Sequence, residues 1–249
     1  MLEHKEWIRI NDIIYIINSI EDADEMRSHF LEAIKMLIPY EKAMFYHVLE
    51  EGGIPHIVKP IFANVSSDFA NAYEKSVLQC EYGRVALNLH KTFAYRDTDL
   101  MSDEIRLSTD VYKSFLKPYD VPYGGGIILA NKGMLISEIT FFKTQEQGDF
   151  TDRDVYIWDI IKDHLELRMI RENAAMNDKL KHKYSKLEEY GLTKREIEVA
   201  LLIVNNYRTA EVSEKLSISI FTTKKHLNNI FTKLNITSRM QLLQLFWKL

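Results

Sequence analysis

The spacing of apolar residues predicts two helices near the start of the chain. Apolar side chains recur every three or four residues from Trp7 to Ile20 and again from Met26 to Leu37, and Pro39 ends the second run. This spacing places the apolar side chains on one face of each helix. We therefore expect two amphipathic helices that pack against a core.

Two pairs of strands are predicted further along the chain. The segments 43–49 and 56–62 are rich in aromatic and β-branched residues and flank a Glu-Glu-Gly-Gly turn. The segments 124–130 and 134–142 flank an Asn-Lys-Gly turn, whose Asn and Gly tolerate the positive φ of a tight hairpin. Two hairpins indicate an antiparallel sheet.

The region between these hairpins has a mixed pattern. It predicts a helix from Ser67 to about Gln79, a loop over residues 95–99, and a short helix from Thr109 to Leu116. Helices before, between and after two hairpins are typical of an α+β fold, in which helices pack on an antiparallel sheet. We expect a GAF/PAS-like sensor domain of this kind.

A long helix is predicted from Asp152 to Tyr190. Thr151 offers a cap, and the acidic residues that follow it favour the positive end of the helix dipole. The helix is apolar on more than one side as far as Ile170 and highly charged beyond it. We therefore expect three parts: a sensor domain at residues 1–170, a helical linker at 171–187 and a second domain at 188–249.

Four helical segments separated by brief turns are predicted in the last part of the chain. Thr193 and Glu196 have the spacing of a capping box. Thr209, Ser219 and the Thr237-Ser238 pair are expected to cap the next three helices. The second and third helices are joined by a tight turn, as in a helix-turn-helix. The sequence therefore predicts an all-α, four-helix helix-turn-helix domain.

The third of these helices is expected to have two different sides. Four residues at helical spacing form its core side: Thr223, Leu227, Ile230 and Leu234. Four others fall on the opposite side: Lys224, Lys225, Asn228 and Thr232. Lysine and asparagine donate hydrogen bonds to base edges in the major groove, and the helix has no carboxylate to repel phosphate. This pattern favours contact with double-stranded DNA.

The uneven distribution of charge along the chain also favours contact with DNA. The net charge is −4, yet all 36 acidic residues lie at or before Glu214. Residues 215–249 therefore carry +6, and residues 1–214 carry −10. Such polarity indicates a local site for a polyanion. Chance clustering on a solvated face would give the same composition, so the spacing of the basic residues has to decide between the two interpretations.

Two blocks of this region resemble the LuxR/FixJ helix-turn-helix family. They are residues 192–199 (LTKREIEV) and residues 222–230 (TTKKHLNNI), the latter followed by Lys233-Leu234. The resemblance implies base contacts by Lys224, Lys225 and Asn228. It implies contacts on the phosphate side by four others: Thr222, His226, Lys233 and Arg239. The sequence departs from the family pattern at Asn206, at Thr223 and over 207–211. A protein-binding helical bundle remains the alternative.

Residues 115–165 resemble GAF-like regulatory domains, in the order of their elements more than in residue identity. GAF and PAS folds hold a small ligand between sheet and helices, so we expect a pocket there. Aromatic residues are expected to line it: Tyr46, Phe62, Tyr73, Tyr82, Phe93, Tyr95, Phe115 and Tyr123. Aromatic residues at this density also serve as ordinary core, so both interpretations stay open.

Several classes of ligand are disfavoured. An acyl-homoserine lactone is disfavoured because Trp7, Trp158 and Trp247 lie outside the predicted sheet, and the cyclic-nucleotide signature of some GAF domains is absent. The residues that would ligate haem or a metal lack the spacing of a site: His47, His56, His90 and Cys80. We therefore expect no metal and no cofactor.

Other classes of protein are excluded or disfavoured as well. A two-component receiver is rejected because the first strand leads into a hairpin rather than an acidic cluster. An enzyme is not expected, since the sequence has no phosphate loop, metal-ligand spacing or nucleophile elbow. No apolar run approaches the roughly 20 residues of a membrane span, and no secretory signal begins the chain. With a single cysteine, these features favour the cytoplasm.

Together these features predict a dimeric, sequence-specific DNA-binding transcription regulator that responds to a signal in its N-terminal domain. The dimer is expected because the last helix has more apolar residues than a small bundle can bury: Met240, Leu243, Phe246 and Trp247. The signal is expected to be an unidentified small-molecule ligand or a protein. The alternative is a ligand-free regulator or adaptor whose N-terminal domain only dimerises or docks a protein partner. A polar-lined cavity would favour sensing, and a filled apolar core would favour the adaptor.

Overall fold

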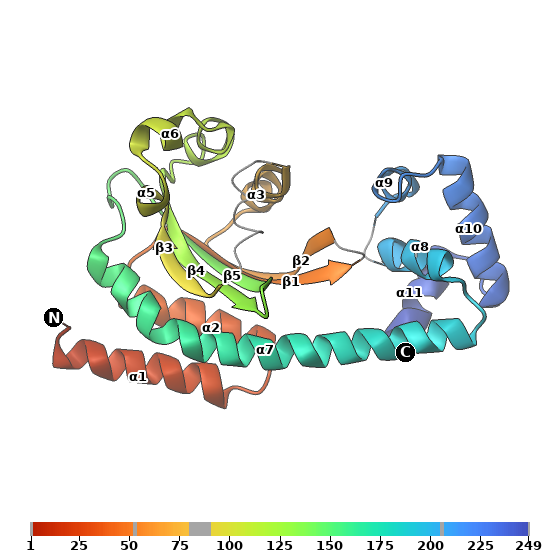
Figure 1. Ribbon diagram of the computed structural model, residues 1–249, viewed down its shortest axis with the longest axis horizontal. Coiled ribbons are helices and arrows are strands. Elements are labelled where there is room, and N and C mark those ends of the chain that lie inside the picture. Colours follow the sequence, from red (N-terminus) through yellow and green to blue (C-terminus); the bar gives the residue numbers. More distant parts are fainter. Residues whose placement is uncertain (1, 52–53, 80–90, 205–206, 249) are drawn as a thin grey trace. The chain divides into compact units, whose positions relative to one another are not determined.

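The computed structural model of this chain describes residues 2–51, 54–79, 91–204 and 207–248. The chain divides into two compact units, Met1–Asn173 and Ala174–Leu249. The first unit contains both helices and strands, and the described residues of the second unit form helices alone (Figure 1). In the described parts of the chain, no helix combines the length and apolar character that crossing a membrane requires.

The first unit begins with two helices and ends in a long one. Its elements are α1 (His4–Ser19), α2 (Ala23–Lys35), β1 (Lys42–Glu51), β2 (Ile54–Ala63), α3 (Ser67–Gln79), β3 (Phe93–Arg96), α5 (Asp97–Leu100), α6 (Asp103–Ser108), the π-helix η1 (Tyr112–Leu116), β4 (Tyr123–Asn131), β5 (Met134–Lys143) and the start of α7 (Asp152–Glu189). The second unit contains the rest of α7, α8 (Lys194–Val204), α9 (Thr209–Lys215), α10 (Ile220–Lys233) and α11 (Arg239–Lys248).

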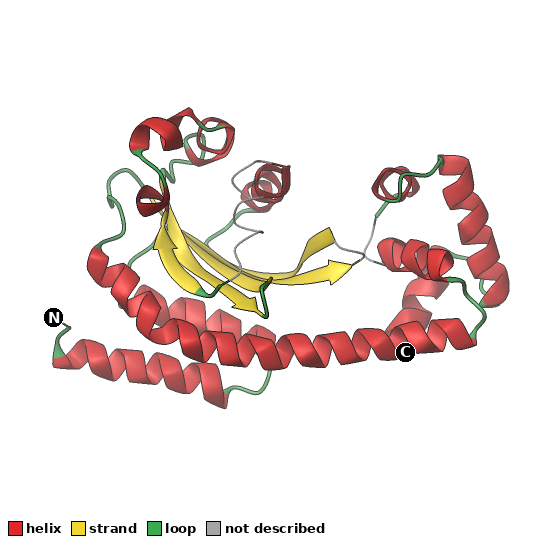
Figure 2. Ribbon diagram, in the orientation of Figure 1, coloured by secondary structure: helices red, strands yellow, loops and turns green. Residues whose placement is uncertain are grey.

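The strands form one antiparallel sheet in the order β2-β1-β5-β4-β3. Helices α1, α2 and the first part of α7 cover one face, whereas α3 and the short helices lie over the other (Figures 1 and 2). The expected α+β architecture, with its two hairpins, long helix and helical C-terminal domain, is confirmed.

The turn between β4 and β5 has a conformation that few residues adopt. Asn131 pairs with Met134, which leaves Lys132 and Gly133 as a two-residue turn. Both have positive φ, 51° and 81°, as tight hairpins require. The expected hairpin is present, but Lys132 rather than Asn131 adopts one of the left-handed conformations.

Each face of the sheet has its own core. On the α7 side, Trp158 is fully buried and stacks on Phe141 with 5.2 Å between ring centroids. On the α3 side, Phe69 packs against Phe115 with 4.8 Å between ring centroids. Most of the expected apolar faces of α1 and α2 are buried, but Trp7 is 45% exposed. The sheet is thus covered by side chains on both faces.

The predicted middle region is partly wrong. Residues 95–99, expected as a loop, belong to β3 and α5. The reason is close packing against the glycine-rich strand β4, because a Cβ on Gly125 would lie 2.9 Å from the Tyr95 carbonyl oxygen. The short helix expected from Thr109 to Leu116 is confirmed, since residues 110–116 are helical and end in the π-helix η1. The Thr109 hydroxyl accepts from the Tyr112 amide at 3.2 Å and so caps this helix.

The predicted caps can be compared with the helix starts. The Thr193 amide donates to Glu196 and the Glu196 amide to the Thr193 hydroxyl, at 2.8 and 3.3 Å, which confirms the capping box. Ser219 accepts from the Thr222 amide at 3.0 Å, as expected. The cap predicted at Thr209 is wrong by one residue. Arg208 precedes α9, and its amide donates to Glu211.

Helix α7 contributes to two cores. Leu165 and Met169 are buried with the sheet of the first unit, whereas Leu187 is buried with α8 and α10 of the second. One continuous helix is therefore part of the packing of both units.

Candidate nucleic-acid interface and ligand site

The core side of α10 is formed as expected. Thr223, Leu227 and Ile230 are buried, and Leu234 closes the stripe. The hydroxyl of Thr223, where the LuxR/FixJ pattern commonly has valine, lies 2.8 Å from that of Ser213 in α9 and also donates to the Ser219 carbonyl. This buried pair satisfies the polar atom and ties the two helices of the helix-turn-helix together.

The opposite side of α10 is exposed along its length. Lys224, Lys225, Asn228 and Thr232 all lie on it. Among the described residues, no hydrogen bond or ion pair engages the ammonium groups of Lys224 and Lys225. The Thr232 hydroxyl donates to the Asn228 carbonyl at 2.9 Å. The face thus presents two uncompensated positive charges and an amide to any approaching ligand.

Lys233 lies beside this face and is engaged in an ion pair. Its ammonium is 2.6 Å from the carboxylate of Glu196 in α8, which is only 4% exposed. Burial opposes ionisation of Glu196, but hydrogen bonds from Lys233 and Thr193 outweigh it and lower its pKa to about 2. The pair anchors the end of α10 to α8. The predicted phosphate contact of Lys233 stays a prediction and has to coexist with this pair.

The other residues expected on the phosphate side also have local partners. Thr222 is half-buried, and its hydroxyl lies 2.8 Å from that of Ser219. Arg239 donates to the hydroxyl of Thr209, which links the first residues of α11 and α9. His226 is half-buried, and its Nδ1 has no partner among the described residues. Their phosphate contacts remain predictions.

A buried polar cluster lies on the α3 side of the sheet. At its centre is Glu138 of β5, directly opposite Tyr46 of β1 in the sheet register. The carboxylate accepts hydrogen bonds from three hydroxyls, those of Tyr46, Tyr95 (2.9 Å) and Thr140 (3.1 Å). Burial raises the pKa of Glu138 above its usual value although these hydrogen bonds act to lower it.

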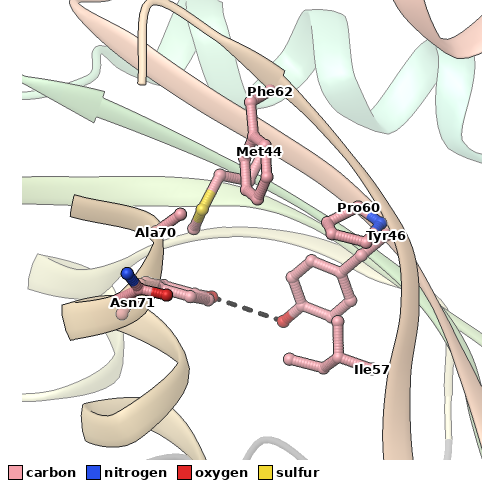
Figure 3. Close-up of a pocket in the computed structure, with 8 residues that line it drawn as sticks. Met44, Tyr46, Ile57, Pro60, Phe62, Ala70 and Asn71 are labelled. Atoms are coloured by element: carbon pink, nitrogen blue, oxygen red, sulfur yellow. Dashed lines mark hydrogen bonds between the residues drawn. The ribbon is translucent and has the colours of Figure 1, made fainter. Parts of the chain in front are cut away.

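A cavity of about 210 Å³ adjoins this cluster. Figure 3 shows Tyr46 and Phe62 from the strands on one side and Ala70 and Asn71 from α3 on another. The Tyr46 hydroxyl lies within hydrogen-bonding distance, 3.3 Å, of the Tyr73 hydroxyl. Its full lining is Met44, Tyr46, Ile57, Pro60, Phe62, Ala70, Asn71 and Tyr73. A small molecule here would meet an apolar wall with hydroxyl and amide groups at one side.

The aromatic residues expected to line a pocket lie in several places. Tyr46, Phe62 and Tyr73 line the cavity. Tyr95 and Phe115 belong to the buried cluster next to it, and Phe93 packs against that cluster. Tyr123 lies apart, with the Arg106 guanidinium 5.5 Å from its ring centre and a hydrogen bond from Gln145. Tyr82 lies outside the described residues.

Sequence reasoning missed the polar members of this site. Glu138 and Thr140 lie inside a segment recognised only as an apolar strand. The signal was available, because a carboxylate within an otherwise buried strand needs partners. Met44 and Asn71 carried no comparable signal.

The residues weighed as metal or haem ligands do not form a described site. His47 is buried, and burial together with the nearby cations Arg27 and Lys59 lowers its pKa to about 3. Cys80 and His90 lie outside the described residues. Among the residues that are described, no three His, Cys, Asp or Glu side chains are grouped to hold a metal ion.

Several solved structures are similar to this chain at low sequence identity. SdiA of Escherichia coli has a TM-score of 0.46 and 15% identity, with 97% of this chain and 95% of SdiA covered. The LBD domain of VqsR from Pseudomonas aeruginosa has a TM-score of 0.49 and 11% identity, with 67% and 95% covered. The GAF domain of a two-component sensor histidine kinase from Bacillus halodurans has a TM-score of 0.41 and 14% identity, with 64% of this chain and 99% of that domain covered.

Two curated relatives match the C-terminal region. The transcriptional regulatory protein LiaR of Bacillus subtilis is 42% identical over 55 residues, which is 22% of this chain and 26% of LiaR. The oxygen regulatory protein NreC of Staphylococcus epidermidis is 40% identical over 53 residues, 21% of this chain and 24% of NreC. The match thus spans about a quarter of the length of these relatives.

The family assignment rests on the same region. Residues 191–246 match the model of the luxR family of bacterial regulatory proteins. They include all of α8, α9 and α10, with the Thr193–Glu196 capping box and the exposed lysines of α10. By its description, this family consists of bacterial regulatory proteins. Residues 191–246 of this chain are therefore a helix-turn-helix domain of the luxR family of bacterial regulatory proteins.

Proposed function

We propose that this chain is a sequence-specific DNA-binding transcription regulator whose N-terminal unit senses a signal. The observation that carries the DNA-binding part is the exposed side of α10, where Lys224, Lys225 and Asn228 lie together in a helix without carboxylates. The major groove of duplex DNA admits an α-helix and offers acceptors on guanine and adenine. The charge and the donors of this face match that groove.

Alanine at both Lys224 and Lys225 is expected to weaken binding to a duplex that carries a site selected from a random pool at least about tenfold, because a lysine contact to a base edge is worth about 1–3 kcal/mol. The measurement is a fluorescence anisotropy titration of a labelled duplex at several salt concentrations. The variant should also show a shallower fall of affinity with salt, since fewer counterions are released.

The matched control for this pair is Lys113→Ala/Lys117→Ala. It removes the same charge from two exposed lysines of the N-terminal unit and should leave the affinity unchanged. If the control loses as much affinity as the α10 pair, net charge rather than the α10 face governs binding. If neither variant changes binding, the α10 face does not contact DNA.

The cavity and its polar cluster support a sensory role for the N-terminal unit. The cavity has hydroxyl groups of Tyr46 and Tyr73 and the amide of Asn71 in its lining, and the rest of the lining is apolar. A filled apolar core was the feature expected of a ligand-free adaptor. We therefore propose a small, mainly apolar ligand with one polar group that hydrogen-bonds to these side chains.

Filling the cavity should abolish ligand binding without unfolding the chain. We expect Ala70→Leu to remove the thermal stabilisation that a bound ligand gives, because the added side chain occupies the site of the ligand. A screen of small molecules for a raised Tm of the wild type, repeated on Ala70→Leu and Tyr73→Phe, makes the measurement. Compounds that stabilise the wild type and Ala70→Leu equally bind elsewhere, and this result would exclude the cavity as the sensory site.

Dimerisation and the helix α7 complete the proposal. A symmetric dimer would place two copies of α10 about one helical turn apart on DNA, and α7, which is part of both cores, would carry the change between the units. The exposed apolar side chains of Leu167 in α7 and Met240 in α11 support self-association. Sedimentation velocity tests the dimer, and a strictly monomeric chain on palindromic DNA would contradict dimerisation.

We also propose that the protein works in the cytoplasm, where its DNA is.

A further inference from the structure

Phe221 is the most exposed large apolar side chain in the described part of the chain, at 79%. It is the second residue of α10 and does not contribute to the buried core of its unit. Single exposed apolar residues are ordinary on protein surfaces, so its position along the helix decides what it does.

Phe221 lies on the exposed side of α10. It precedes Lys224 and Lys225 by three and four residues and Asn228 by seven, which is the spacing of one helix face. The core stripe, which includes Leu227 and Ile230, lies on the opposite side. The ring therefore stands within the face proposed to enter the major groove. It lies near the N-terminal end of α10, the part of a recognition helix that contacts bases.

The ring has no hydrogen-bonding group, so its partner on DNA must be apolar. In the major groove the apolar group of a base pair is the C5-methyl of thymine. Packing the ring against this methyl removes apolar surface from water on both sides. We propose that Phe221 contacts the C5-methyl group of a thymine and makes the protein prefer thymine at that position of its site. This inference rests on the proposed DNA-binding function.

The surroundings of the ring favour DNA over an apolar protein surface. Lys224 and Lys225 follow it on the same face, and the whole of α10 lacks a carboxylate. A partner that covers the ring must therefore also accept two ammonium groups. Duplex DNA does so, because phosphates flank the groove in which the methyl group lies. An apolar protein surface would have to desolvate both charges.

Deoxyuridine tests the contact because it differs from thymidine only by the missing methyl group. A duplex selected from a random pool by the full-length protein is prepared with each thymine replaced in turn. For the wild type, one replacement in each half-site should lower the affinity about three- to tenfold. The same replacement should leave the affinity of Phe221→Ala unchanged, because the ring that meets the methyl is gone. Phe221→Leu, which keeps an apolar side chain, should retain a smaller preference for thymine.

Two further measurements separate this inference from other causes. Because the ring is exposed, Phe221→Ala should keep the circular dichroism spectrum of the wild type and its affinity for mixed-sequence DNA. The inference is overturned if no replacement affects the wild type, or if Phe221→Ala loses as much affinity on replacement as the wild type. If the wild type selects no site at all, the proposed DNA-binding function fails first and the inference fails with it. A wild type that selects a site and ignores the methyl groups overturns the inference alone.

Discussion

Trp158→Ala is expected to lower the free energy of unfolding of the N-terminal unit by about 3–5 kcal/mol. Trp158 is fully buried in α7 and stacks on Phe141 of β5. Its ring also packs against that of Phe150, with 4.9 Å between the ring centroids. Truncation removes the largest side chain that joins α7 to the sheet and leaves a void that the surrounding rings fill only in part. Because domains are stable by about 5–15 kcal/mol, this is a large share of the total.

Urea denaturation followed by circular dichroism measures this effect, and the Tm should fall on the order of 10 °C. Trp158→Phe is the matched control. The indole Nε1 is buried without a hydrogen-bond partner among the described residues, so phenylalanine sacrifices no hydrogen bond, leaves a smaller void than alanine and should lose much less free energy of unfolding. If phenylalanine proves as costly as alanine, the ring stack is not what holds α7 to the sheet.

Glu138→Ala is expected to have the second largest effect, a loss of about 3 kcal/mol or more. The change leaves the hydroxyls of Tyr46, Tyr95 and Thr140 without their shared acceptor inside the protein. A buried donor left unpaired costs about 1–3 kcal/mol. Glu138→Gln keeps the shape of the side chain and one acceptor oxygen, so it should lose much less free energy of unfolding. Equal losses for alanine and glutamine in urea denaturation would mean that the carboxylate does not organise the cluster.

The pH dependence of the stability of the wild type and of Glu138→Gln gives an independent test of the pKa of Glu138. Burial raises the pKa of Glu138 above the ordinary value of 4.5. Below pH 4.5 the group is protonated in both states, so its full contribution is present. As the pH rises towards the raised pKa, the unfolded chain loses its proton first and the folded state loses stability. The stability of the wild type relative to Glu138→Gln should therefore fall from about pH 4.5 upward. A relative stability that rises over this range would contradict the raised pKa.

The parts of the fold that were predicted correctly have strong local patterns. The periodicity of α7, the turn between β4 and β5 and the Thr193–Glu196 capping box involve residues close together in the sequence. The region around β3 was not predicted, because β3 has four residues and its position depends on glycines of β4 that allow close approach. A strand so short has no period that a sequence pattern reveals.

In the candidate sites, too, features set by nearby residues were predicted and features set by tertiary packing were missed. The exposed lysines of α10 follow from helical spacing within one segment. The Lys233–Glu196 pair joins residues 37 positions apart, and the Glu138 cluster joins side chains of three strands, so both depend on tertiary packing. Phe221 was missed for another reason: an apolar residue is ordinarily assigned to the core, and its exposure, on which the proposed thymine contact rests, is seen only in the fold.

Whether α10 recognises DNA can be measured by selecting bound duplexes from a random DNA pool with the full-length protein and, alongside it, with Lys224→Ala/Lys225→Ala. We expect the wild type to enrich a palindromic site and this variant not to, while Lys113→Ala/Lys117→Ala enriches the same site as the wild type. Enrichment of one and the same site by the wild type and by Lys224→Ala/Lys225→Ala would contradict the assignment of α10 as the DNA-recognition helix.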